Sequence, residues 1–91
     1  MISFSEACKQ AYDYYAYQGF YGLRNAKDIG DRYAFLGYVN PIPFGGIVPI
    51  TISKKSGKLE EFDPFPQKNA EILKSGQIIP IPDEFKPIKN T

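Results

Sequence analysis

The sequence predicts an α+β domain in which an N-terminal helix packs on an antiparallel sheet of three to four strands, with a short second helix near the C-terminus. Three observations lead to this fold class: a capped amphipathic segment at the N-terminus, apolar strand-like segments joined by a glycine turn, and a second helical segment that stops at Gly76. The 91 residues are enough for one domain with a single core layer. We expect this domain to span residues 1–82 and a polar tail to span residues 83–91.

The first helix is predicted to begin at Phe4, because residues 3–6 read Ser-Phe-Ser-Glu. This is the pattern of a capping box, in which the Ser3 hydroxyl accepts from the Glu6 amide and the Glu6 carboxylate accepts from the Ser3 amide. Gly19 is suited to end the helix in a left-handed conformation. Apolar residues at spacings of three and four predict one buried stripe, made of Phe4, Ala7, Cys8, Ala11 and Tyr15.

Tyrosines crowd the second half of this helix, at Tyr12, Tyr14, Tyr15 and Tyr17. Because they point around most of the helix circumference, some of them must be exposed. Two interpretations remain open. The rings either pad the edge of the core while their hydroxyls stay in water, or they form an aromatic patch for a protein partner.

The middle of the chain has one clear strand and one clear loop. From Arg32 the residues alternate, with Tyr33 and Phe35 on one side and their neighbours on the other. Residues 40–46 hold two prolines and two glycines, which predict a connecting loop with Phe44 exposed at its tip. Residues 22–31 have a weaker pattern, which fits a short irregular strand or a loop.

A hairpin and a second helix follow. Residues 47–53 are apolar and β-branched and predict a strand, although Pro49 favours an edge position or a bulge near its start. Residues 54–57, Lys-Lys-Ser-Gly, predict the hairpin turn, and residues 58–62 the returning strand. Residues 67–75 predict the short helix. Residues 77–82 contain two prolines and fit either a short edge strand or an extended cover strip.

Composition restricts the classes of function. The chain has no histidine and one cysteine, which removes the usual groups for proton transfer and for zinc binding. We therefore expect no enzymatic activity, no cofactor and no metal. A formal charge of +1 also disfavours binding to nucleic acid or to anionic membranes.

Paired carboxylates are the remaining route to an enzyme, since glycosidases use two of them. The candidates are Asp28 with Asp31, or Glu60 and Glu61 with Asp63. Solvated surface acids are the simpler interpretation, because Asp and Glu are rarely buried.

The expected location is the cytoplasm. Cys8 is alone, so it cannot form an internal disulfide, whereas secreted domains of this size commonly need such bonds. Residues 1–6 lack the basic and apolar regions of a signal peptide, and no stretch approaches the roughly 18 apolar residues of a membrane span.

Four segments together resemble the small bacterial immunity proteins that are encoded beside polymorphic or contact-dependent toxins. They are residues 30–35 (Gly-Asp-Arg-Tyr-Ala-Phe), residues 49–52 leading into the turn at 54–57, residues 69–73 (Asn-Ala-Glu-Ile-Leu) and residues 81–82 (Ile-Pro). The resemblance covers about residues 3–82 and lies in structural motifs. Tyr33 stands where such proteins often have tryptophan, and Thr51-Ile52 departs slightly from their apolar pair.

The resemblance implies a cytosolic protein that binds a cognate toxin, encoded nearby, and blocks its active site or substrate path. Toxins that act on nucleic acid commonly have basic clefts, which an acidic surface would complement. The expected partner-binding residues are therefore the acids Asp28, Asp31, Glu60, Glu61 and Asp63, with Tyr38 and Phe44 as aromatic anchors. The alternative is a small cytosolic structural or regulatory domain that forms a homodimer through exposed tyrosines or an open sheet edge.

Overall fold

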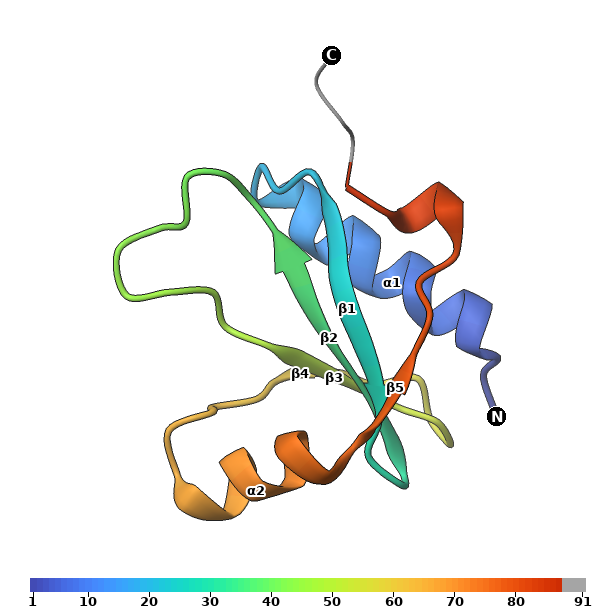
Figure 1. Cartoon of the computed structure of the whole chain (residues 1–91). Coiled ribbons are helices and arrows are strands. Elements are labelled where there is room, and N and C mark those ends of the chain that lie inside the picture. The colour runs from blue at the N-terminus through green and yellow to red at the C-terminus, as the bar shows by residue number, and fades with distance from the viewer. Residues whose placement is uncertain (88–91) are drawn as a thin grey trace.

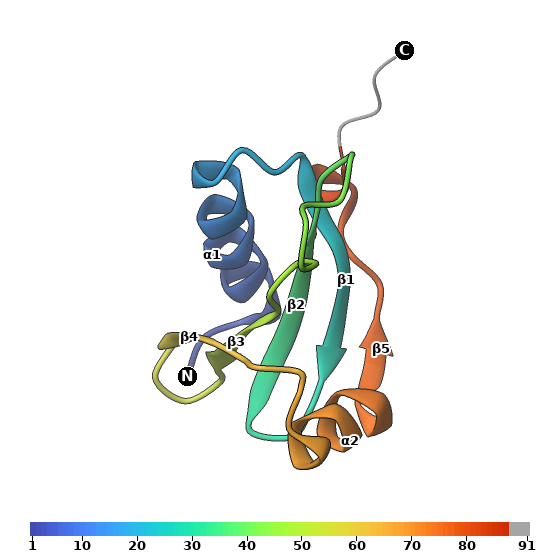
Figure 2. The same ribbon diagram turned by 90° about the vertical axis from the view of Figure 1, so that its left-hand side faces the viewer.

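A single antiparallel sheet organises the chain, with α1 on one side of it and α2 near the opposite side (Figures 1 and 2). The computed structural model describes residues 1–87. Its strand order is β4-β3-β2-β1-β5. The elements are α1 (Phe4–Tyr17), β1 (Gly22–Asp28), β2 (Arg32–Tyr38), β3 (Ile50–Ser53), β4 (Leu59–Glu61), α2 (Gln67–Ser75), β5 (Gln77–Ile79) and the 3-10 turn η1 (Asp83–Phe85).

The predicted α+β class is confirmed, and the sheet has five strands where three to four were expected. The additional strands come from the two segments whose sequence left alternatives open. Residues 22–28 form β1, next to the central strand, and residues 77–79 form the edge strand β5.

The weak pattern of β1 has a structural cause. The register with β2 shifts between Leu23 and Asn25, which marks a bulge or a similar irregularity. Leu23 and Ala26 are both fully buried although they lie three positions apart. A regular strand would place such residues on opposite faces. The bulge therefore hides the period-two signal.

The start of α1 follows the predicted capping box. The Glu6 amide donates to Ser3 Oγ at 3.1 Å, and the Ser3 amide donates to Glu6 Oε1 at 3.4 Å. The buried side chains of α1 are Ala7, Cys8, Ala11 and Tyr15, and they pack against Leu23, Ala26, Phe35, Ile50 and Ile52 of the sheet. This is the main core of the domain.

Gly37 in β2 permits the close approach of α1. A Cβ atom built at this position would lie 2.6 Å from the Tyr15 ring and 2.7 Å from the Phe20 ring. Because both neighbours are aromatic rings packed in or against the core, any larger residue at position 37 would push α1 away from the sheet.

The C-terminal boundary differs from the expectation. Phe85 in η1 is buried, and its ring centroid lies 5.7 Å from that of Tyr12 in α1. The prediction that a polar tail begins at residue 83 is therefore wrong for residues 83–87, because one aromatic side chain anchors this segment to the core. Residues 88–91 of the predicted tail lie outside the described residues.

The second helix, α2, is packed less closely than α1. All its side chains are at least partly exposed. Lys27 Nζ of β1 donates to the Leu73 carbonyl at 2.7 Å, and Asn69 Nδ2 donates to the Asp63 carbonyl at 2.9 Å.

None of the helices in residues 1–87 is long and apolar enough to cross a membrane.

Candidate protein-binding surface

The sheet has one face that α1 leaves uncovered, which we call the open face. Register pairs align Lys27 of β1 with Ala34 of β2, Ala34 with Thr51 of β3, and Thr51 with Glu60 of β4. Side chains of directly paired residues share a face, and the residues next to them in sequence point the other way. The row from Lys27 to Glu60 therefore lies opposite the α1 core.

A hollow of about 160 Å³ lies between the open face and α2. Its lining includes Asn25, Lys27, Ala34, Leu36, Pro49 and Leu73, with more apolar than polar surface. Small-molecule sites usually measure about 300–1,000 Å³, whereas about 150 Å³ is enough for one benzene-sized group. The size of this hollow therefore suits one side chain of a protein partner better than a metabolite.

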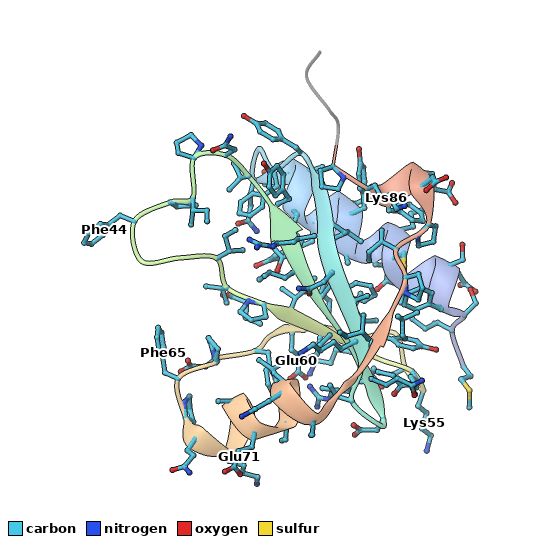
Figure 3. The ribbon with its side chains drawn as sticks, in the orientation of Figure 1. Phe44, Lys55, Glu60, Phe65, Glu71 and Lys86 are labelled. Carbon is cyan, nitrogen blue, oxygen red and sulfur yellow. The ribbon has the colours of Figure 1, made fainter. Side chains whose placement is uncertain are left out.

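A loop of residues 39–49 stands beside the hollow and presents Phe44. The Gly46 amide donates to the Pro43 carbonyl at 3.0 Å, and Gly45 has φ of 91°. This is the arrangement of a type II turn, whose third position needs positive φ and whose second position is here Phe44. Phe44 is fully exposed, and its side chain projects from the loop (Figure 3).

Tyrosine hydroxyls hold both ends of this loop. Tyr21 donates to the Asn40 carbonyl at 3.3 Å, and Tyr15 donates to the Val48 carbonyl at 2.6 Å. The Tyr15 oxygen also lies 3.3 Å from the Phe35 carbonyl, so we assign its single proton to the shorter contact. Burial raises the pKa of Tyr15, which keeps the hydroxyl protonated and able to donate.

Large apolar side chains are also exposed on the loop, before α2 and on β5. Phe65 precedes α2 and is 83% exposed, and Figure 3 shows it at the same side of the molecule as Phe44. The loop contributes Ile42 and Val48, and β5 contributes Ile78. Single exposed apolar residues are ordinary on protein surfaces, whereas several that lie close together are typical of an interaction site.

The predicted acidic residues are largely engaged within the protein. Both Asp28 oxygens accept from Lys54 Nζ at 2.8 Å, and the Gly30 amide donates to Oδ1 at 2.9 Å. The Lys54 hydrogen bonds, followed by the Gly30 amide, lower the pKa of Asp28. Asp63 Oδ1 accepts from the Phe65 amide at 3.0 Å, which closes a local turn before α2.

Glu60 is paired as well. Its carboxylate lies 3.3 Å from Arg32 Nη1 and 3.4 Å from Lys58 Nζ, and the hydrogen bond from Arg32 is the first cause of its lowered pKa. Glu61 is exposed but is paired in register with Ile50, which places it on the other side of the sheet from Glu60. Asp31 is exposed at the β1–β2 turn. The five acids therefore do not form one unpaired acidic surface in the described structure.

The two predicted aromatic anchors occupy different environments. Tyr38 ends β2 and is half-buried, with its ring centroid 6.2 Å from that of Tyr21. Phe44 is fully exposed on the loop. Of the two, Phe44 is the one whose ring is available to a partner, whereas Tyr38 helps to build the base of the loop.

Several residues of this surface were not among the predicted partner-binding residues. Tyr15 and Tyr21 hold the loop, and Lys27 and Leu73 join α2 to the open face. The sequence did carry one signal for the loop: residues 39–49 contain three prolines, two glycines and no charged residue. Such a segment is restricted in conformation and apolar at the same time, which is unusual for a solvated connection.

Comparison with known proteins gives no relative. No family model matches the chain, and no curated protein or solved structure shows significant similarity to it.

Among residues 1–87, no three His, Cys, Asp or Glu side chains are grouped so that they could hold a metal ion. The fold and the surface define a small α+β domain with a protruding apolar loop beside an open sheet face.

Proposed function

We propose that this protein is an immunity-type binding protein that neutralises a cognate bacterial toxin by direct non-covalent binding. The observation that carries the proposal is the hydrogen-bonded loop of residues 39–49, which presents the fully exposed Phe44 beside the open face. Aromatic side chains are enriched in the cores of protein interfaces, where a residue that is exposed in the free protein becomes buried against the partner. The resemblance of about residues 3–82 to immunity proteins supplies the kind of partner.

The state of the acids supports binding over catalysis. A general acid at neutral pH needs a raised carboxyl pKa. The pKa values of Asp28 and Glu60 are instead lowered by their cationic neighbours Lys54 and Arg32. Both carboxylates are thus suited to ion pairing inside the protein.

The proposal is tested by co-expression with the product of the adjacent open reading frame. We expect the wild-type protein to restore growth of cells that express the neighbouring toxin, and to co-purify with it. The matched variants are Phe44→Ala and Tyr17→Ala, because both residues are exposed aromatics but Tyr17 belongs to α1. Growth arrest that the wild-type protein does not relieve, together with no co-purification, would contradict the proposal.

A second candidate is a structural or regulatory domain that acts as a homodimer. Ile78 favours it, because this side chain is exposed on β5, an edge strand of the sheet that residues 1–87 form. Unpaired strand edges can join to a second chain. Light scattering coupled to size-exclusion chromatography distinguishes the candidates, since a stable dimer that Ile78→Lys converts to a monomer would support this one.

A further inference from the structure

The loop of residues 39–49 is shaped before any partner binds. The turn at residues 43–46 is closed by a hydrogen bond, and the tyrosine hydroxyls at Asn40 and Val48 fix the two ends. The three prolines restrict the backbone further. Binding therefore costs little additional ordering of this segment, which is the condition under which an exposed side chain contributes strongly to affinity.

The chemistry of the loop defines the surface that it fits. No charged residue occurs from residue 39 to residue 53. A charged cleft on the partner would lose its hydration against this segment without gaining an opposite charge. Phe44 stands at the corner of a protruding turn, so its complement is concave.

We infer that Phe44 is the anchor of the interface and that it inserts into an uncharged, apolar pocket on the partner protein. This inference rests on the proposed function and gives the partner a recognition pocket of stated chemistry. Burial of the Phe44 ring, and not charge pairing, is then the main source of affinity, because Asp28 and Glu60 already have partners within the chain. Insertion at or near the active-site entrance would block the toxin without any chemical step.

The pocket is assigned to a different protein and not to a second copy of this chain. The hollow beside Pro49 is the receptor that a second copy would offer, and Asn25 and Lys27 contribute polar groups to its lining. The hollow is mainly apolar, but a ring that enters it would lie against Lys27, whose ammonium group donates to the Leu73 carbonyl at 2.7 Å. A pocket without charge is the better complement of Phe44.

Tyr15 is a positioning residue for this anchor. Its hydroxyl reaches the Val48 carbonyl from within the α1 core, so it ties the loop to the most buried part of the domain. Removal of the hydroxyl in Tyr15→Phe should let the loop move while the ring continues to fill the core. The effect on binding should then depend on whether Phe44 is present.

The test is calorimetric titration of the toxin domain from the adjacent open reading frame with four variants. These are Phe44→Ala, Tyr15→Phe, the combination of both, and the control Tyr17→Ala. We expect Phe44→Ala to weaken binding by about 30-fold or more, the usual effect of truncating an interface anchor. Tyr17→Ala should change affinity by less than about twofold, and Tyr15→Phe should add nothing once Phe44 is removed.

A salt series tests the chemistry of the pocket. Between about 50 mM and about 500 mM sodium chloride, wild-type affinity should change by less than about threefold, because screening acts on charged contacts. A steep loss of affinity with salt would overturn the assignment of an uncharged pocket.

The outcomes separate the inference from the proposed function. Tight wild-type binding that Phe44→Ala leaves unchanged overturns the inference and leaves the function intact. No binding by the wild type removes both. A dimer of the isolated protein that Phe44→Ala dissociates in sedimentation analysis would assign the loop to a second copy and overturn the inference. Thermal unfolding of Phe44→Ala should match the wild type, because this side chain is fully exposed.

Discussion

The two faces of the sheet are covered in different ways. On the α1 face, Tyr15 and Phe35 are almost completely buried, and the Phe4 and Tyr33 rings meet edge to face with centroids 5.1 Å apart. On the open face, α2 has no fully buried side chain and is joined to the sheet by the hydrogen bond from Lys27 to Leu73. Extensive apolar burial holds the first helix, whereas the second combines this hydrogen bond with side chains that are only partly buried.

This difference shows how so small a domain can have both a stable core and a free surface. A domain of this size has one core layer, and here it lies between α1 and the sheet. The open face can then keep apolar side chains exposed for a partner. The loop that carries Phe44 projects sideways from the sheet (Figure 1) and takes its support from Tyr15 in the α1 core. A rigid core therefore positions a surface that contributes little to stability.

The largest predicted effect is on the free energy of unfolding, which should fall more when a side chain is truncated on the α1 face than when one is truncated on the open face. Phe35→Ala should cost about 3–5 kcal/mol, because it empties a fully buried site under α1. Leu73→Ala, in the half-buried side chain of α2, should cost about 1 kcal/mol. Urea unfolding followed by far-ultraviolet circular dichroism measures both values. Similar costs for the two variants would show that the faces contribute equally and would break the comparison.

Much of the fold could be predicted from local signals. The capping box, the glycine turn at residues 54–57 and the short helix at residues 67–75 each depend on residues close together in the chain. The errors came from long-range contacts. The bulge in β1 is visible through its register with β2, and Phe85 is buried because it meets Tyr12, which is far away in sequence.

The candidate surface was only partly predictable for the same reason. Phe44 was expected to be exposed at a loop tip, since prolines and glycines surround it, and the structure confirms this position. The engagement of Asp28 could not be predicted, because Lys54 lies 26 positions away. Lys27 and Leu73 are 46 positions apart. Sequence spacing gave the residue types, and the sheet topology decided which charges meet.

The second predicted effect concerns the attachment of α2. Lys27→Met removes the ammonium group that donates to the Leu73 carbonyl at 2.7 Å, and leaves this carbonyl only the longer contact of 3.4 Å from the Gly76 amide. Amide exchange in residues 67–75 should become faster by about 5–30-fold, which corresponds to the loss of about 1–2 kcal/mol of local stability. Exchange in α1 should not change.

Lys74→Met is the matched control for that variant. Lys74 is exposed and lies in the last turn of α2, next to Leu73, so this substitution also removes a positive charge close to the Leu73 carbonyl. Mass spectrometry of exchanged peptides should show a clearly smaller effect than for Lys27→Met. Equal effects of the two substitutions would attribute the attachment to helix charge and not to the hydrogen bond across the open face.

The smallest predicted effect is the pH dependence of two ion pairs, one on each face. The pKa of Asp28 is lowered in the folded protein, so its stabilising contribution is complete above the ordinary aspartate pKa of about 3.9 and disappears as the pH falls through the lower folded value. Asp28→Asn should therefore destabilise the protein at neutral pH and have little effect in strong acid. Glu60→Gln on the open face should show the same sign, because the Glu60 pKa is also lowered.

The Asp28 substitution should have the larger effect of the two. Asp28 receives two contacts of 2.8 Å from Lys54, which also lies 5.0 Å from the centre of the Tyr33 ring on the α1 face. Glu60 receives longer contacts, of 3.3 and 3.4 Å, from Arg32 and Lys58. Urea unfolding of both variants at several pH values measures the difference. A larger loss for Glu60→Gln would show that the open face, and not the α1 face, carries the stronger polar contacts, because the two substitutions remove the same kind of charge.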